Sequence, residues 1–311
     1  MEIKKELSDA IVAIVAPGGY AADPCAVERA TARLEASGCR VRNFYNAAAI
    51  HQRFGGTDAA RAAQLHEAAA DPDVQIVLAL RGGYGMSRLL SSLDLPALAA
   101  SGKLFVGHSD FTALQMAFLA QSGSISFAGP MICDDFSRAE PSGFALENFW
   151  QCVTGPTHTL RFEGEKNPII DVSGILWGGN LTMLAHLVGT PYMPRIEGGI
   201  LFVEDVNEHP YRVERMLLQL FHAGLLNQKA IVLGDFSSYR LSEYDNGYDF
   251  AAMLNYLRER LGVPIFTGLP FGHIRDKATL VVGSQAQLRS DGQTVSLVMR
   301  GYPSLLRSAR A

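Results

Sequence analysis

Residues 104–111 read Leu-Phe-Val-Gly-His-Ser-Asp-Phe, and they give the clearest indication of how the 311-residue chain folds. Its first three residues form a short apolar run, which is typical of a strand buried on both faces of a parallel sheet. The run ends at Gly107, and residues 110–121 have a helical composition rich in Ala, Leu and Met. A buried strand that turns sharply into a helix is the basic unit of an open α/β sheet, so we predict this fold class.

Earlier segments repeat this pattern and extend the predicted sheet. Apolar runs alternate with helical stretches at residues 11–16, 23–38, 40–45, 57–70 and 74–80. The helix at 23–38 opens with Asp23-Pro24, a capping residue followed by proline at the first helical position. The alternation predicts an N-terminal open parallel-sheet domain over residues 1–153, with a nucleophile-elbow-like turn at Ser109.

The pattern changes near Thr154. Residues 154–171 contain Gly155-Pro156, Gly164 and Pro168 with little periodicity, so we predict an interdomain linker there. Beyond it, strand-like and helical segments mix, at residues 200–203, 208–222, 230–233, 249–261, 278–282 and 294–299. They predict a smaller mixed α/β domain over residues 172–311, because a chain longer than about 250 residues usually divides into two domains.

The composition is that of an ordinary globular protein, with 48% hydrophobic residues, 19% charged residues and a net charge of -4. No basic stripe favours nucleic-acid binding, and no apolar stretch is long enough to span a membrane. No HExxH or clustered Cys/His spacing favours a metal, so we expect neither a metal nor another cofactor. The cysteines share no pairing pattern, which suits reduced thiols in a cytoplasmic protein: Cys25, Cys39, Cys133 and Cys152.

Ser109 is the first candidate for chemistry. A serine on a tight strand-to-helix turn exposes its hydroxyl, and the N–H of the next residue, Asp110, lies at the positive helix end where it can stabilise an oxyanion. The second glycine of the common GxSxG turn is missing, because Phe111 occupies that position. From the residues alone, a nucleophile and a plain helix cap both remain open.

A glycine-rich turn, Arg81-Gly82-Gly83-Tyr84-Gly85, follows another predicted strand. Such a turn brings backbone N–H groups close to a ligand, which makes Gly83 a candidate for the second oxyanion donor. The alternative is an ordinary tight turn between a strand and a helix. The GxGxxG and P-loop patterns are absent, so a dinucleotide or nucleotide phosphate site is disfavoured.

A nucleophilic serine needs a base and a carboxylate that orients it. Of the eight histidines, His273 is preferred because it lies on a glycine-flanked loop, whereas His108 adjoins Ser109 on a sharp turn and points away. A predicted strand ends in Glu204 and Asp205; either could orient a histidine, and Asp205 could instead cap the next helix. A carboxylate pair for glycoside cleavage also remains open at this point.

Five sequence blocks together resemble the LD-carboxypeptidases, a family of serine peptidases. They run in the family's order over nearly the whole chain: Arg81-Gly82-Gly83-Tyr84-Gly85, Gly107-His108-Ser109-Asp110, Gly178-Gly179-Asn180-Leu181, the stretch from Glu204 to Arg215, and Gly268-Leu269-Pro270-Phe271-Gly272-His273. The resemblance implies that Ser109 is the nucleophile, Glu204 the orienting acid and His273 the base. It also implies an oxyanion hole formed by the backbone of Gly83 and Asp110.

The resemblance further implies a cytoplasmic homodimer, with the site between two domains, that removes the terminal D-alanine from L,D-linked muropeptide tetrapeptides during peptidoglycan recycling. Arg81 is our candidate for binding the free carboxylate, with a surface salt bridge as the alternative, and Asn180 is a second substrate-binding candidate.

Two other functions remain open. One is a related peptidase that cleaves a peptide–nucleotide antibiotic and needs an aromatic stacking surface. Trp177 could supply that surface or simply pack in the core. The other is a muropeptide-binding protein whose three residues do not assemble.

Overall fold

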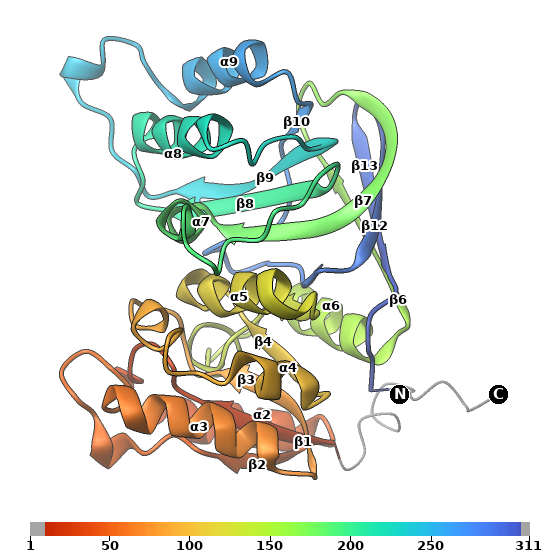
Figure 1. Ribbon diagram of the computed structural model, residues 1–311. Coiled ribbons are helices and arrows are strands. Elements are labelled where there is room, and N and C mark those ends of the chain that lie inside the picture. The colour runs from red at the N-terminus through yellow and green to blue at the C-terminus, as the bar shows by residue number, and fades with distance from the viewer. Residues whose placement is uncertain (1–9, 306–311) are drawn as a thin grey trace.

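In the computed structural model, which describes residues 10–305, the chain forms two β-sheets with helices packed between and around them (Figure 1). The α/β class predicted from the sequence is confirmed. Residues 1–9 and 306–311, which form the ends of the two predicted domains, lie outside the described range. Within that range, no helix combines the length and the apolar composition needed to cross a bilayer.

The first sheet has five parallel strands and one antiparallel edge strand. Its order is β2-β1-β3-β4-β5-β11. The apolar runs form its centre, and every residue of β1 and β4 is buried. The run at 40–45 differs, because β2 lies at the edge and its residues are half-buried or exposed. The strands are β1 (Ile11–Val15), β2 (Arg40–Asn43), β3 (Val74–Ala79), β4 (Leu104–Gly107), β5 (Ser126–Ala128) and β11 (Leu280–Val282).

Each pair of consecutive strands from β1 to β5 is connected by a segment that contains a helix, as parallel pairing requires. Thr57 caps α3 by accepting the N–H of Ala60, whereas α2 begins later than Asp23-Pro24 because Asp23 closes a turn by accepting the N–H of Cys25. Helix α5 lies between the two sheets, and its first eight residues are all buried (Figure 1). The helices are α2 (Ala26–Ala36), α3 (Asp58–Ala70), α4 (Leu95–Ala100), α5 (Thr112–Ser122) and α6 (Gly143–Thr154).

The second sheet is mixed, with the order β10-β9-β8-β7-β12-β13-β6. Strands β10 to β7 pair in parallel, and the remaining pairs are antiparallel. Its strands are β6 (Thr157–Glu163), β7 (Ile169–Asn180), β8 (Ile200–Val206), β9 (Ala230–Ser237), β10 (Ile265–Phe266), β12 (Gln285–Asp291) and β13 (Thr294–Arg300). The helices that accompany it are α7 (Leu181–Leu187), α8 (Pro210–His222) and α9 (Phe250–Leu261).

The predicted linker at 154–171 is largely β-structure. Strand β6 forms one edge of the second sheet, and β7 begins at Ile169. In β6 only alternate residues are buried, namely His158, Leu160 and Phe162. Because the buried set includes a histidine and the outward residues are polar, the apolar content is low and the strand is hard to recognise. Strand β11 also crosses the predicted boundary, since it comes from the second half of the chain and pairs with β5.

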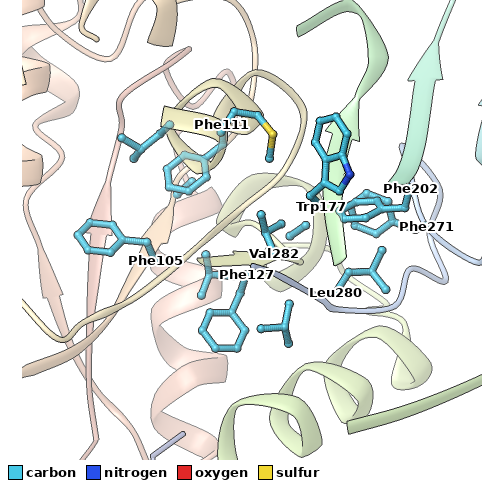
Figure 2. Close-up of a cluster of buried hydrophobic side chains, with 14 of the residues drawn as sticks. Phe105, Phe111, Phe127, Trp177, Phe202, Phe271, Leu280 and Val282 are labelled. Atoms are coloured by element: carbon cyan, nitrogen blue, oxygen red, sulfur yellow. The ribbon is translucent and has the colours of Figure 1, made fainter. Parts of the chain in front are cut away.

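Apolar side chains from both sheets form one continuous core, part of which Figure 2 shows. The rings of Phe202 and Phe271 meet edge to face, with centroids 5.4 Å apart. Because protein interiors are closely packed, this core fixes the positions of the strand ends in the two sheets relative to each other. The labelled members are Phe105, Phe111, Phe127, Trp177, Phe202, Phe271, Leu280 and Val282.

Asn148 of α6 links the first half of the chain to the second half through hydrogen bonds, and its replacement tests that link. Its buried Oδ1 accepts the N–H of Thr279 at 2.7 Å and lies 3.2 Å from Nε2 of His158. Asn148→Ala leaves a buried N–H without its acceptor, so we expect the free energy of unfolding in urea to fall by about 1–3 kcal/mol. Gln151→Ala, at an exposed position of the same helix, should change it by less than about 0.5 kcal/mol. Equal effects of the two substitutions would contradict this role.

Candidate active site

Ser109 lies on a sharp turn between β4 and α5. Its φ of 61° is in the left-handed region, which is uncommon for residues other than glycine. Gly82 makes the turn possible, because a Cβ added there would lie 2.7 Å from the Cβ of Ser109. Helix α5 begins after Phe111 and has no side-chain cap, so Ser109 does not serve as its cap.

His273 and Glu204 complete a hydrogen-bonded line with Ser109. Nε2 of His273 lies 3.0 Å from the Ser109 hydroxyl oxygen, and Nδ1 lies 2.8 Å from Oε2 of Glu204. Glu204 belongs to β8 and is fully buried, whereas His273 lies on the loop between β10 and β11. Gly272 lets this loop approach closely, because its φ is 140° and an added Cβ would lie 3.3 Å from Oε2 of Glu204.

The electrostatic surroundings of His273 favour a base. Burial lowers its pKa, but the hydrogen bond and the negative charge of Glu204 outweigh this, and the net pKa is raised above the usual 6.5. Nδ1 must carry a proton to donate to the Glu204 carboxylate, so Nε2 has a lone pair that can accept the hydroxyl proton of Ser109. The three side chains therefore have the geometry of a Ser–His–Glu triad, in which the acid orients the base and the base can accept the serine proton.

Asp205, the other acid that the sequence left open, has a different environment. Oδ2 of Asp205 accepts both the backbone N–H and the hydroxyl of Thr182, each at 2.8 Å. Asp205 therefore holds the first turn of α7 rather than His273.

Asn180 does not lie where a substrate contact was predicted. Its side chain is buried and donates to Oε1 of Glu204 at 3.3 Å and to Oδ1 of Asp205 at 3.0 Å, while its oxygen accepts the N–H of Met183. All its hydrogen-bonding groups are thus engaged, and it is not among the residues that line the pocket beside Ser109. In this arrangement it orients the two carboxylates of β8.

The turns that carry Gly83 and Asp110 are tied together. The buried carboxylate of Asp110 accepts the N–H of Met86 at 2.7 Å, which joins the turn after β3 to the turn after β4. Burial raises the pKa of this carboxyl, and the backbone hydrogen bonds oppose the rise only in part. Gly83 and Ser109 line the same pocket, so the two candidate oxyanion donors belong to turns that flank the serine.

A pocket of about 150 Å³ opens beside Ser109 and is rich in cationic groups. Arg81 contributes a guanidinium that donates to the carbonyl oxygen of Tyr20 at 3.4 Å, and within residues 10–305 it forms no ion pair. The surface salt bridge considered for Arg81 is therefore not seen in this range. The lining residues are Arg81, Gly82, Gly83, His108, Ser109, Met131, Asp134, Arg138, His273 and Lys277.

Sequence analysis missed a buried ion pair at this pocket. Nζ of Lys277 lies 3.0 Å from Oδ1 of Asp135, and each side chain is only 2% exposed. Only one weak signal is present in the sequence, a lysine that directly precedes the apolar segment at residues 278–282. In the described part of the chain, no group of three or more His, Cys, Asp or Glu residues is placed to hold a metal ion.

Trp177, the proposed stacking residue, is completely buried. Its Nε1 donates to Oε1 of Gln228 at 3.0 Å, and Figure 2 shows its ring within the apolar core. Of the two roles considered for Trp177, the structure supports packing in the core.

Gly82→Ala tests how closely Ser109 depends on its neighbours. The new Cβ would displace the serine side chain, so we expect labelling by a fluorophosphonate serine probe to slow by about 100-fold. Gly143→Ala is the control, because an added Cβ there meets nothing within 4 Å. Labelling of folded Gly82→Ala protein at the wild-type rate would show that this close approach does not govern Ser109.

Comparison with known proteins adds an independent result. Residues 12–129 match the N-terminal domain of the LD-carboxypeptidases, and residues 173–288 match their C-terminal domain. The chain is 31% identical to the murein tetrapeptide carboxypeptidase of Pseudomonas aeruginosa over 293 residues, which cover 91% of this chain and 94% of that protein.

Solved structures agree. A crystal structure of muramoyltetrapeptide carboxypeptidase from Oxalobacter formigenes has a TM-score of 0.91 and 54% identity, covering 95% of this chain and 100% of that one. The microcin C7 self-immunity protein MccF, in complex with aspartyl sulfamoyl adenosine, has a TM-score of 0.85 at 23% identity, covering 96% of this chain and 98% of that one. This second likeness shows a shared fold alone. The resemblance identified from the five sequence blocks is confirmed: the chain belongs to the LD-carboxypeptidase family and is a serine-type carboxypeptidase.

Proposed function

We propose that this enzyme removes the terminal D-alanine from the L,D-linked tetrapeptide of muropeptides. The main support is the hydrogen-bonded line from Glu204 through His273 to Ser109, which ends in a pocket that also contains the Arg81 guanidinium. The names of the Pseudomonas and Oxalobacter relatives support the peptide class. We further propose that the enzyme acts as a homodimer in the cytoplasm, on fragments of recycled peptidoglycan.

In the proposed acylation step, Nε2 of His273 accepts the hydroxyl proton while Oγ of Ser109 attacks the carbonyl carbon that precedes D-alanine. The backbone N–H groups of Gly83 and Asp110 donate to the oxygen that becomes negative. Glu204 keeps the Nδ1–H tautomer of His273 and stabilises the imidazolium that forms. Its buried position strengthens this interaction, because little water competes for the carboxylate.

The remaining steps restore the enzyme. The carbon–nitrogen bond breaks, and the imidazolium of His273 gives its proton to the leaving amine of D-alanine. A water molecule then attacks the ester on Ser109 and gives one proton to His273. When the ester bond breaks, Ser109 takes that proton and the tripeptide leaves with its new carboxylate.

Arg81 is proposed to select a free C-terminus. A carboxypeptidase must recognise the terminal carboxylate, and a guanidinium can bind it with two parallel hydrogen bonds. Arg81 precedes the turn that carries Gly83, so this contact would place the scissile carbonyl beside the proposed oxyanion donors.

Cleavage of a peptide–nucleotide antibiotic is the second candidate, and the structure gives it less support. The MccF-like neighbours share the fold at low identity, and the proposed stacking residue Trp177 is buried and unavailable to a nucleobase. We therefore favour the muropeptide substrate.

Incubation with three substrates tests the proposed function. We expect wild-type enzyme to release one alanine from an L,D-linked muropeptide tetrapeptide, detected by mass spectrometry, and to leave an all-L control peptide intact. Ser109→Ala should fold normally and release no alanine, because the attacking oxygen is gone. Comparable release by this variant would refute the nucleophile, and preferential cleavage of an aminoacyl-nucleotide analogue would favour the second candidate.

Arg81→Gln tests recognition of the carboxylate. Loss of a charge-assisted hydrogen bond costs about 1.5–3 kcal/mol, so KM should rise by about 10- to 100-fold while kcat changes little. For a substrate with a C-terminal amide, wild-type enzyme should show a similarly raised KM. The Arg81→Gln substitution should not raise the KM for this amide substrate any further. Arg289→Gln, at an exposed position of the second sheet, is the control. If Arg81→Gln raised the KM for the amide substrate as much as the KM for the free acid, the proposed contact would be contradicted.

A further inference from the structure

A cluster of three polar side chains lies near the proposed catalytic residue His273 and has no role in the mechanism proposed above. Its members are Lys277, Asp135 and His108. Nζ of Lys277 lies 3.0 Å from Oδ1 of Asp135 and 3.5 Å from Nε2 of His108. Lys277 and His108 both line the pocket beside Ser109. The ring of His108 also meets the ring of His273 edge to face, with centroids 5.4 Å apart.

The hydrogen-bond partners assign the proton positions in this cluster. Nδ1 of His108 lies 2.9 Å from the carbonyl oxygen of Gly129, which can only accept, so this nitrogen carries the proton. Nε2 then has a lone pair and accepts from the ammonium of Lys277. Burial, followed by the charge of Lys277, lowers the pKa of His108 well below its usual value, so His108 is neutral beside the cation.

The cluster joins segments that are far apart in the sequence. Lys277 lies on the same loop as His273, His108 immediately precedes Ser109, and Asp135 lies in the π-helical turn Ile132–Phe136 after β5. Lys277 therefore attaches the loop of the proposed base to the segment of the proposed nucleophile, independently of the contact between His273 and Ser109.

Attachment alone does not explain the charges. A buried ion pair is usually no more stabilising than apolar side chains of the same size, because both ions lose their hydration. The positive end of the pair lies at the pocket beside His273, and burial and this positive charge lower the pKa of His273 while Glu204 raises it.

We propose that Lys277 is a positioning residue that holds the His273 loop against the Ser109 turn through Asp135 and His108, and that its charge favours the neutral imidazole that accepts the serine proton. The inference rests on the proposed roles of Ser109 and His273 but not on the identity of the substrate. Other charged or titratable groups that face His273 or line its pocket are Glu204 and Asp205 of β8, Asp235 of β9, His108, Arg81, Asp134 and Arg138.

The double variant Asp135→Asn/Lys277→Met tests the proposal, because it removes both charges and leaves neither ion unpaired. The new Asn oxygen can still accept the N–H of Met131, which Asp135 now accepts at 2.8 Å. The readout is the rate at which a fluorophosphonate probe labels Ser109 between pH 5 and pH 9. Labelling requires neutral His273, so the rate falls as the pH drops through the pKa of His273.

Without the cation, His273 should hold its proton up to a higher pH. We therefore expect the ratio of the double-variant rate to the wild-type rate to be at least about threefold lower at pH 6 than at pH 9. Lys277→Met alone should show the same pH dependence and a lower melting temperature, since Asp135 is left unpaired. Lys103→Met, at the opposite end of β4 where Nζ donates to the Asp71 carbonyl, should keep a constant ratio.

Three outcomes would overturn the proposal. A ratio that is equal at pH 6 and pH 9 would mean that the pair has only a structural role. A ratio that is higher at pH 6 would mean that Lys277 acts on His273 with the opposite sign. An unchanged labelling profile with a raised KM for the peptide would mean that Lys277 binds substrate instead. Failure of the proposed function is distinguishable, because wild-type enzyme would then label normally yet release no alanine.

Discussion

The contact between Nε2 of His273 and the hydroxyl of Ser109 places the strictest geometric demand on the fold. It joins two residues that are 164 positions apart in the chain. Ser109 follows strand β4 of the first sheet, and His273 lies on the loop after strand β10 of the second. A hydrogen bond of this kind tolerates displacements of only a few tenths of an ångström, so the two sheets must hold a fixed relation. The continuous apolar core, the return of β11 to the first sheet and the buried ion pair of Lys277 all maintain it.

The site shows how a small number of polar contacts can specify geometry inside an apolar interior. Glu204 and Asp205 are consecutive residues of β8, where its pairing with β9 is irregular, and the amide nitrogen of Asn180 donates to both carboxylates. The carboxylate of Glu204 then lies beside His273, and the carboxylate of Asp205 accepts the N–H of Thr182 in the first turn of α7. Similarly, the carboxylate of Asp110 connects the turn of Ser109 with the turn of Gly83. In both cases, a side chain from one segment holds a neighbouring segment in place through hydrogen bonds.

Much of the first sheet could be predicted because its central strands are buried on both faces and read as short apolar runs. Strand β6 of the second sheet was harder to predict. Strand β6 alternates buried and exposed residues, and its Gly and Pro flanks favoured a linker. Ser109, Glu204 and His273 were selected by local context and by family resemblance. The role of Asn180 could not be predicted, because its partners Glu204 and Asp205 lie on a strand that only the folded sheet brings beside it. The same holds for Lys277 and Asp135.

Strand β11 has a consequence for how the protein can be divided. A fragment that stops near residue 153 would lack this strand, and β5 would become an open edge with unsatisfied backbone N–H and C=O groups. Such an edge is a template for pairing with other chains, so the first half made alone would be prone to self-association. During synthesis the sheet that carries Ser109 stays incomplete until residues 280–282 emerge, shortly after the loop that carries His273.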